Sequence, residues 1–306
     1  MKMTRKLSHT NHIDLVTITM TAELADAYRT KREGVNHILT QVEQTFPTTP
    51  KLVLDVETKL RTLQEARAEP LKVASANWAA TGWMISLVKE NCVIVDVGST
   101  TTSIIPIAKG AISAESKNDL EKLINGELVY TGSLRTNVAA TVNTIPVNGC
   151  IARVSSELFA QSADVHLILG NITEKEYTVE TADCRDKTRN AALARLARVV
   201  CADSEMLSEK EIVGMAQYVY ERQVEHITEA LAKVYNRLNN NGAIPAVVTG
   251  IGRNFLARKA ALQLGVTEVI DFAELTNGDV ARVSTAFAVA LIGACTLEGR
   301  VVRWTL

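Results

Sequence analysis

The chain has 306 residues, of which 47% are hydrophobic and 22% charged, a composition typical of a globular protein with room for two cores. The net charge of −1 excludes a basic field for nucleic acid or an anionic membrane, and no apolar run is long enough to span a bilayer. A polar stretch follows the basic start, where a signal peptide would need an apolar core. Five scattered cysteines without a Cys-x-x-Cys pair indicate reduced thiols in a cytoplasmic protein.

The first quarter of the chain alternates short apolar runs with amphipathic stretches. Residues 14–21 and 51–56 are predicted to be strands. Residues 31–44 carry apolar side chains at helical spacing, and residues 60–68 and 73–84 favour two more helices. This order of elements is typical of an α/β protein.

Candidate site residues follow the first strand and open the third helix. Glu23 and Asp26 are three residues apart, so on a helical turn they would share a face that can hold a metal or accept a proton. A solvated first turn is the alternative, since acidic residues are frequent there. Asn77 is polar among small apolar neighbours, so we interpret it as a substrate-binding candidate and Trp78 as a core residue.

The most informative stretch is NCVIVDVGSTTTSIIPIAKG, residues 91–110. Two β-branched runs predict a hairpin whose turn presents backbone N–H groups, hydroxyls and one carboxylate. The carboxylate would repel a phosphate unless it faces Mg²⁺ bridging to phosphate oxygens. We therefore predict Mg²⁺ at Asp96 and a phosphate site at Gly98, Ser99, Thr100, Thr101 and Thr102, where Gly98 lets a ligand approach the backbone. An ordinary Thr-rich hairpin is the alternative.

The middle of the chain offers weaker signals. Residues 119–124 favour a short helix, residues 142–154 a hairpin, and residues 164–170 a buried strand containing a core histidine, His166. Arg135, at the end of an alternating segment, is either a clamp for an anion or a surface arginine.

Polar loop material comes next and is followed by helices. Asp183 lies in the irregular stretch 171–190, which is typical of site loops. Helices are predicted at 191–200 and 208–238, the second opened by a capping box and closed by a turn at 239–242.

The last unit repeats the association of strand, glycine and helix. A strand at 246–248 leads through Gly250 and Gly252 into a helix at 254–264, an arrangement that lets a phosphate approach a helix N-terminus. A strand at 268–271 and a small-residue helix at 283–296 follow.

Several of these blocks together resemble one known family. The hairpin turn DVGSTTT resembles the second phosphate loop of the superfamily of sugar kinases, heat-shock ATPases and actin, in its hydantoinase/oxoprolinase-like branch. The blocks VTITMTAELADAYRTKREGV, SANWAATG, GELVYTGSLRT, ADVHLILGNITEKEYTVETAD, ARLARVVCAD and VVTGIG are similar to those of the proteins linked to tetrahydromethanopterin-dependent one-carbon transfer. The similarity extends from about residue 12 to residue 294.

The resemblance implies a two-lobed, actin-like (ribonuclease H-like) ATPase fold. We expect a first lobe at 1–91, a second lobe at 92–282 and a C-terminal helix and tail at 283–306 that pack back on the first lobe. Family members begin with a Gly-rich phosphate hairpin that is not seen before Ile13. The first lobe is therefore expected to lack this hairpin, and its exposed strand edge leads us to expect a homo-oligomer.

The resemblance also implies a transferase of methanofuran biosynthesis. Its substrates would be an aminomethylfuran-methyl diphosphate and the phenol of γ-glutamyltyramine, joined as an ether with release of diphosphate. Mg²⁺ is the implied cofactor, Asp96 and Arg135 would help to bind diphosphate, with Gly250 and Gly252 across the cleft, and either Glu23 or Asp183 would accept the phenol proton. Two alternatives remain: an ATP-dependent, hydantoinase/oxoprolinase-like or kinase-like enzyme, and a non-catalytic protein that binds a nucleotide or diphosphate.

Overall fold

The computed structural model describes residues 13–238, 243–276 and 278–301. They form two compact units. The first unit takes in the described residues up to Asn91, Ile107–Ile124 and those from Leu275 onward, and the second takes in Cys92–Pro106 and Asn125–Glu274. These units differ from the predicted ranges 1–91, 92–282 and 283–306. The hairpin of residues 91–110 begins in the second unit, but its last residues and the segment up to 124 belong to the first unit.

The first unit is built on a three-stranded sheet. Strand β1 (Val16–Ile18) is parallel to β2 (Lys51–Leu54), which is antiparallel to β3 (Leu60–Arg61). Helices α2 (Lys31–Thr45), α3 (Leu63–Ala68) and α4 (Pro70–Val73) pack on it around a buried apolar core. The expectation of a missing hairpin concerns residues before Ile13, which lie outside the described part of the chain.

The remaining elements of the first unit come from three parts of the chain. Helix α5 (Asn77–Ser86) packs against α14 (Ser284–Glu298), and the hydroxyls of Thr81 and Thr285 are 3.0 Å apart. Gly293 lets α14 lie close to β1, because a Cβ there would come within 2.5 Å of Thr17 Cγ2. The first unit also contains strand β6 (Ala111–Ile112) and the helices α6 (Asp119–Asn125) and α13 (Gly278–Arg282).

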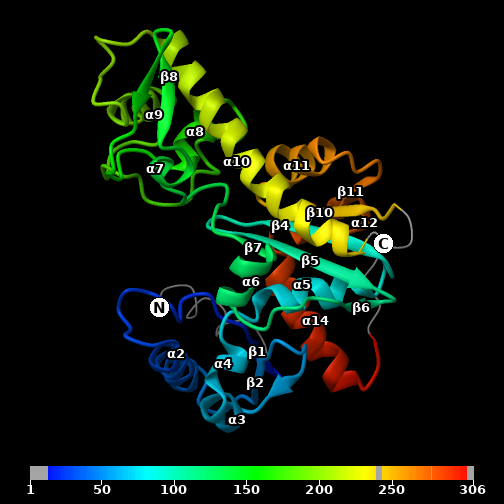
Figure 1. Ribbon diagram of the computed structural model, residues 1–306. Helices are drawn as coiled ribbons and strands as arrows, with labels where there is room; N and C mark the ends of the chain where they lie inside the picture. The colour runs from blue at the N-terminus through cyan, green and yellow to red at the C-terminus, as the bar shows by residue number, and fades with distance from the viewer. Residues whose placement is uncertain (1–12, 239–242, 277, 302–306) are drawn as a thin grey trace. The chain divides into compact units, whose positions relative to one another are not determined.

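The second unit contains the mixed sheet that carries the predicted phosphate turn (Figure 1). Its strands lie in the order β11 (Val269–Asp271), β10 (Ala246–Gly250), β4 (Cys92–Val97) and β5 (Thr102–Ala108), and the end of β5 pairs with β6. Strands β4, β10 and β11 are parallel, and β7 (Leu128–Val129) pairs with β5. Apolar residues of β4 and β10 pack with those of α10 (Glu209–Leu238) and α11 (Arg258–Gln263) in one core.

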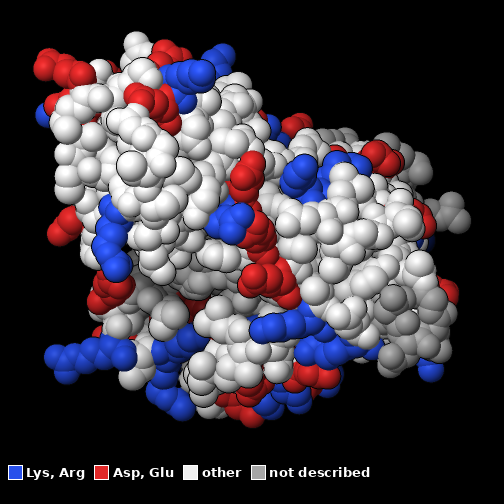
Figure 2. All heavy atoms as spheres, turned by 45° about the horizontal axis from the view of Figure 1, so that its top comes forward, with Lys and Arg blue, Asp and Glu red and all other residues white. Residues whose placement is uncertain are grey.

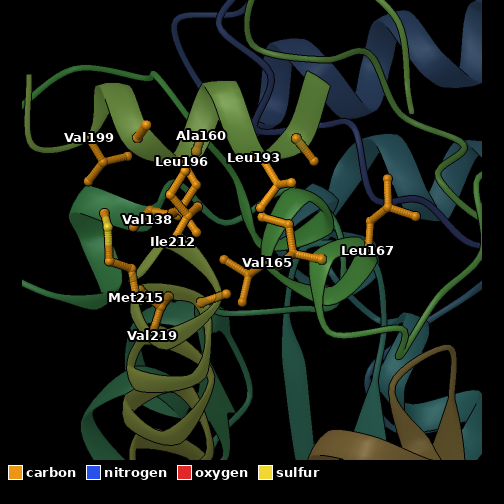
Figure 3. Packing of buried hydrophobic residues seen from close by; sticks show 14 of the residues in the cluster. Val138, Ala160, Val165, Leu167, Leu193, Leu196, Val199, Ile212, Met215 and Val219 are labelled. Carbon is orange, nitrogen blue, oxygen red and sulfur yellow. The ribbon is translucent and has the colours of Figure 1, made fainter. Parts of the chain in front are cut away.

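A second core surrounds the N-terminal half of α10. It joins the hairpin β8 (Thr144–Val147) and β9 (Cys150–Arg153) to the helices α7 (Val138–Thr141), α8 (Ser162–Ile168) and α9 (Arg189–Arg198). Figure 3 shows Leu193 and Leu196 of α9 directed toward Val165 of α8 and toward Ile212 and Met215 of α10. The capping box predicted at the start of α10 is confirmed, since Ser208 and Glu211 exchange hydrogen bonds.

The predicted strand at 164–170 is wrong, because these residues belong mostly to helix α8. A short apolar run that is buried on every side shows no strand or helix periodicity, so its pattern did not distinguish the two. The local signal for a helix is the capping box between Gln161 and Asp164. The helix predicted at 60–68 is also only partly right: its start forms β3, and Thr62 caps α3. The turn predicted at 239–242 lies outside the described residues.

The helix predicted after the glycine turn begins irregularly. Residues Arg253–Ala257 form a π-helical turn before α11 continues. Short helices α12 (Phe272–Leu275) and α13 follow β11. No described helix is both long and apolar enough to cross a bilayer. On the face drawn in Figure 2, basic and acidic side chains lie in small mixed groups.

The prediction that His166 is a core histidine is confirmed. Its ring is fully buried, with Nε2 3.0 Å from Gln223 Oε1, Nδ1 3.2 Å from Asn171 Nδ2, and its centroid 4.6 Å from that of Phe255. Burial lowers the pKa of His166 to about 3, against a smaller raising effect of the hydrogen bond with Gln223.

We expect His166 to make the protein less stable at mildly acidic pH. The unfolded chain binds a proton at this ring below a pKa of about 6.5, whereas the folded protein does not until about pH 3, so stability falls as the pH falls between these values. From pH 6.5 to 5 this group should remove about 2 kcal/mol from the free energy of unfolding, measured by urea denaturation. His166→Gln should show a correspondingly smaller change, and an equal change in both proteins would contradict the assignment.

Candidate functional site

The predicted phosphate turn is a tight connection between β4 and β5, held by the segment that follows β7. Gly98 N donates to Thr101 O at 2.9 Å and closes the turn. Ser133 N donates to Gly98 O, and the amides of Leu134 and Arg135 both donate to Ser99 O, each at 2.9 Å. The carbonyl side of the turn is therefore bound by protein donors.

The N–H side of the turn can bind an acceptor from outside the turn. Within the described residues, the N–H groups of Ser99 and Thr100 have no hydrogen-bond acceptor. Their side chains are half-buried, as is that of Thr101. Consecutive N–H groups of this kind form a concave anion site. Thr102 is different, because its hydroxyl is buried and donates to Thr131 O at 2.8 Å, which is a structural contact. Arg135 is exposed.

A buried hydrogen-bond network fixes the backbone behind the turn. Gly132 lies so close that a Cβ on it would be 2.7 Å from backbone atoms of Ser99 and Thr100. Gln223 Nε2 donates to Gly132 O and to Thr131 Oγ1, both at 2.8 Å, while its Oε1 faces His166. Because each partner is buried, this network holds the turn in one geometry.

Gly250 and Gly252 lie directly beside the turn, in the strand next to β4 and just after it. Thr249 is paired with Asp96 and Gly250 with Val97. Gly250 has φ +86°, and a Cβ on it would be 2.4 Å from Val97 O and 2.6 Å from Asp96 Oδ1. Gly252 N donates to Val97 O at 3.0 Å. Both glycines are therefore required by close packing around the end of β4.

Asp96 fits the role of a single carboxylate ligand. It is the next-to-last residue of β4, beside the turn, and is half-buried; Gly250 packs so closely against it that a Cβ would lie 2.6 Å from its Oδ1. Among the described residues, no group of three His, Cys, Asp or Glu side chains could hold a metal ion by itself. Mg²⁺ is commonly bound by one or two carboxylates together with substrate phosphates, so one carboxylate next to an anion site suits it.

The glycines of the turn offer a test of the anion site. A Cβ on Gly98 would meet its nearest atom, Thr101 O, at 3.5 Å, which is ordinary contact. Gly98→Ala should therefore keep the melting temperature and weaken binding of Mg²⁺-diphosphate, measured by calorimetry, by about tenfold through the lost approach to the backbone.

The matched control is Gly250→Ala. It should lower stability by at least about 1–2 kcal/mol, because the residue has a left-handed φ and faces Val97 O. Undiminished diphosphate binding by the Gly98→Ala protein would argue against a ligand at this turn.

In the first unit, Glu23 is the predicted site residue with the most unusual environment. The segment after β1 forms irregular turns rather than a helix, so Glu23 and Asp26 do not share a face: Glu23 is only 2% exposed, while Asp26 is exposed. Ser75 Oγ donates to Glu23 Oε1 at 2.6 Å, and Glu23 Oε2 is buried without a hydrogen-bond partner among the described atoms. A buried carboxylate oxygen without a partner costs free energy, so its presence calls for an explanation, and a catalytic role is one.

Glu23 belongs to a cluster of four polar residues. Ser75 Oγ also contacts Asp119 Oδ2, and Lys31 Nζ lies 3.2 Å from Ser75 Oγ and 2.7 Å from Asp119 Oδ2. Two carboxylates against one ammonium leave the cluster with one negative charge. A hydroxyl has one proton to donate, so Ser75 can satisfy only one carboxylate at a time.

Two backbone features hold the cluster in its geometry. Gly34 in α2 faces Glu23 so closely that a Cβ would be 2.2 Å from Glu23 O. Ser75 has φ +54°, a left-handed conformation that is strained for a residue with a side chain.

The cluster opens into a pocket of about 580 Å³ in the first unit, to which Lys31 and Asp119 contribute. Its other walls are mainly leucines from the turn after β1, from α4 and from α6: Leu24, Leu71, Leu120 and Leu123. This size and apolar lining are typical of sites for small organic ligands. Asn77, the predicted substrate-binding residue, is half-buried at the start of α5, two residues after Ser75.

Asp183 has the contacts of a structural residue. Its carboxylate accepts hydrogen bonds from Arg195 at 3.1 Å and Arg198 at 3.0 Å, both in α9. Desolvation raises the pKa of Asp183, but the hydrogen bonds from Arg198 and the backbone of Arg185, together with the charge of Arg195, lower it overall. A carboxylate paired with two arginines is a weak proton acceptor, so the contacts favour Glu23 over Asp183.

Sequence reasoning missed Lys31, Ser75 and Asp119. Lys31 and Ser75 are 44 residues apart, as are Ser75 and Asp119. Each looks ordinary in its own segment: Lys31 and Asp119 begin helices, and Ser75 lies in a stretch of small residues. The tertiary fold alone brings them together, and the left-handed φ of Ser75 leaves no mark in the sequence.

Comparison with known proteins identifies the family. Residues 14–291 match the hydantoinase/oxoprolinase family. A protein of Methanocaldococcus jannaschii called (4-{4-[2-(gamma-L-glutamylamino)ethyl]phenoxymethyl}furan-2-yl)methanamine synthase is 41% identical over 284 residues, which cover 92% of this chain and 83% of that protein. A protein of Methanococcus vannielii with the same name is 35% identical over 67% of this chain and 91% of its own length.

Solved structures of similar fold include an ATP-dependent carboxylase. Acetone carboxylase in its nucleotide-free form, from work on the mechanism of ATP-dependent acetone carboxylation, aligns with a TM-score of 0.53 and 10% identity. The alignment covers 85% of this chain and 38% of the carboxylase chain. Since the family match spans almost the whole described chain and includes the phosphate turn and the Glu23 cluster, the protein belongs to the hydantoinase/oxoprolinase family, together with these furanmethanamine synthases.

Proposed function

We propose that this protein is a transferase of methanofuran biosynthesis that makes the product named for its relatives. The name describes a furan-2-yl methanamine joined through a phenoxymethyl ether to a γ-glutamylaminoethyl group. The reaction joins an aminomethylfuran-methyl diphosphate to the phenol of γ-glutamyltyramine and releases diphosphate. The observation that carries the proposal is 41% identity over 92% of the chain.

The chemistry asks the protein mainly to bind the leaving group. The furan ring stabilises positive charge on its methylene carbon, so departure of diphosphate is aided most by groups that neutralise the developing anion. The N–H groups of Ser99 and Thr100 and the nearby hydroxyls suit this role. Asp96 would hold Mg²⁺, which supplies charge neutralisation when bound. The exposed Arg135 stays a candidate for a further phosphate contact.

The phenol must lose its proton as the ether bond forms. Glu23 is the carboxylate that we assign to this step, with Ser75 Oγ carrying the proton to it from the pocket side. Lys31 offsets the charge of Asp119 at 2.7 Å, whereas the unpartnered Oε2 of Glu23 remains to accept a proton. Asn77, near Ser75, is the candidate that orients the substrate.

An ATP-dependent enzyme is the second candidate. The family match supports it. The similarity to acetone carboxylase concerns the fold only. We also propose that the two units correspond to the lobes of an actin-like ATPase fold and that the protein is cytoplasmic. Self-association would use the edge of the first unit's sheet at β1, which is an edge strand among the described residues. A non-catalytic diphosphate-binding protein is the third reading, and the relatives named as synthases weigh against it.

One assay separates these functions. The protein is incubated with Mg²⁺ and γ-glutamyltyramine together with either the furanmethyl diphosphate or ATP, and phosphate, diphosphate and the aryl ether are measured. The proposal predicts equal amounts of ether and diphosphate from the furan substrate and none of these products from ATP. Release of phosphate from ATP alone would support the second candidate.

A further inference from the structure

We infer that the leucine-lined pocket of the first unit is the binding site for γ-glutamyltyramine, with its phenol at Lys31 and Asp119, its ring among the leucines and its amino-acid end at Lys117 and Glu57. This inference rests on the proposed function and adds the residues that select the phenolic substrate.

The leucines of the pocket are poorly explained by folding alone. Leu24, Leu71, Leu120 and Leu123 are between 45% and 68% exposed, although they come from three separate segments. Exposed apolar side chains that converge on one pocket mark a ligand site. An aromatic ring gains most from such a lining, because it buries apolar area with little loss of conformational freedom.

The polar end of the pocket suits a phenol. Asp119 can accept a hydrogen bond from the hydroxyl, and Lys31, 2.7 Å from Asp119 Oδ2, supplies the positive charge that stabilises a developing phenolate. The phenol proton then passes to the carboxylate cluster, the phenolic oxygen bonds to the furan methylene carbon, and the electron pair of the breaking C–O bond leaves with diphosphate. The carboxylates Asp119 and Glu23 disfavour a diphosphate at this end.

Charged groups for an amino-acid end lie at the rim. Lys72, Lys117 and Glu57 line the pocket. The pKa of Glu57 is lowered mainly by its hydrogen bond with Lys59, and the charges of Lys117 and Lys72 lower it further. Lys72 is paired with Glu69, and Glu57 is paired with Lys59 and, at 4.0 Å, with Arg61, whereas Lys117 has no ion pair among the described residues. The lining carries three lysines and two carboxylates, which favours a ligand ending in a carboxylate.

Two substrates and two variants test the assignment. Lys117→Ala should raise KM for γ-glutamyltyramine about tenfold and leave that for tyramine, which lacks the amino-acid end, unchanged. Leu120→Ser should raise KM for both by about tenfold. Neither should change KM for the furanmethyl diphosphate. The controls are Lys175→Ala and Leu158→Ser, exposed residues of the second unit, which should match the parent protein.

Calorimetry with γ-glutamyltyramine alone separates this inference from the proposed function. Binding that weakens about tenfold in both variants supports the pocket, whether or not ether forms. If ether forms but the variants bind and turn over γ-glutamyltyramine like the parent, the pocket assignment is overturned while the function stands. A rise in KM for the furan diphosphate instead would also overturn it.

Discussion

Asp96→Asn should lower kcat for ether formation by about 100- to 1000-fold, the range seen when one group stabilising a developing anion is removed. The change keeps the shape of the side chain and removes its charge, so it should leave the fold of β4 intact and weaken the hold on Mg²⁺. The measurement is the initial rate at several Mg²⁺ concentrations, with circular dichroism to verify folding.

Gly98→Ala gives the comparison for this variant. It touches the same turn without changing charge, so it should affect diphosphate binding and show the Mg²⁺ dependence of the parent protein. If the Asp96→Asn protein turns over normally at every Mg²⁺ concentration, Asp96 is a structural residue and the metal has no part in leaving-group stabilisation.

Glu23→Gln should lower kcat by about 100- to 10,000-fold, the usual contribution of a positioned proton acceptor, with little change in KM for γ-glutamyltyramine. The amide keeps the hydrogen bond that Ser75 Oγ donates at 2.6 Å and loses only the ability to take up a proton. Because Glu23 is buried, the free energy of unfolding of the variant is measured beside its rate.

Asp183→Asn is the matched control, since it removes the other carboxylate considered from the sequence. It breaks ion pairs with Arg195 and Arg198, so stability should fall by about 1–2 kcal/mol while kcat stays within a factor of about two. A large loss of kcat in this variant together with an active Glu23→Gln protein would reverse the assignment of the base.

The sequence was most informative where local chemistry determines local structure. The hairpin at 91–110, the capping box of α10 and the core position of His166 all follow from short-range patterns, and the structure confirms them. The strand predicted at 164–170 is wrong because a fully buried apolar run has no exposed face to reveal its period.

Only part of the candidate site could be predicted from the sequence, for a related reason. The turn that ends β4 is one continuous motif, whereas the Glu23 cluster is assembled from residues of three segments by the fold of the first unit. Glu23 drew attention as an acidic residue after a strand, but its burial and its contact with Ser75 depend on Gly34 and on the left-handed backbone of Ser75. Neither feature can be read from the types of the neighbouring residues.

The most direct test of the account uses a furanmethyl diphosphate labelled with ¹⁸O at the oxygen that joins carbon to phosphorus. Our proposal is a transferase in which that carbon–oxygen bond breaks and the phenol oxygen takes its place. Mass spectrometry of the products should then find the label in diphosphate and an unlabelled ether. A phosphorylated phenol together with a furanmethanol that retains the label would show attack at phosphorus and contradict the account.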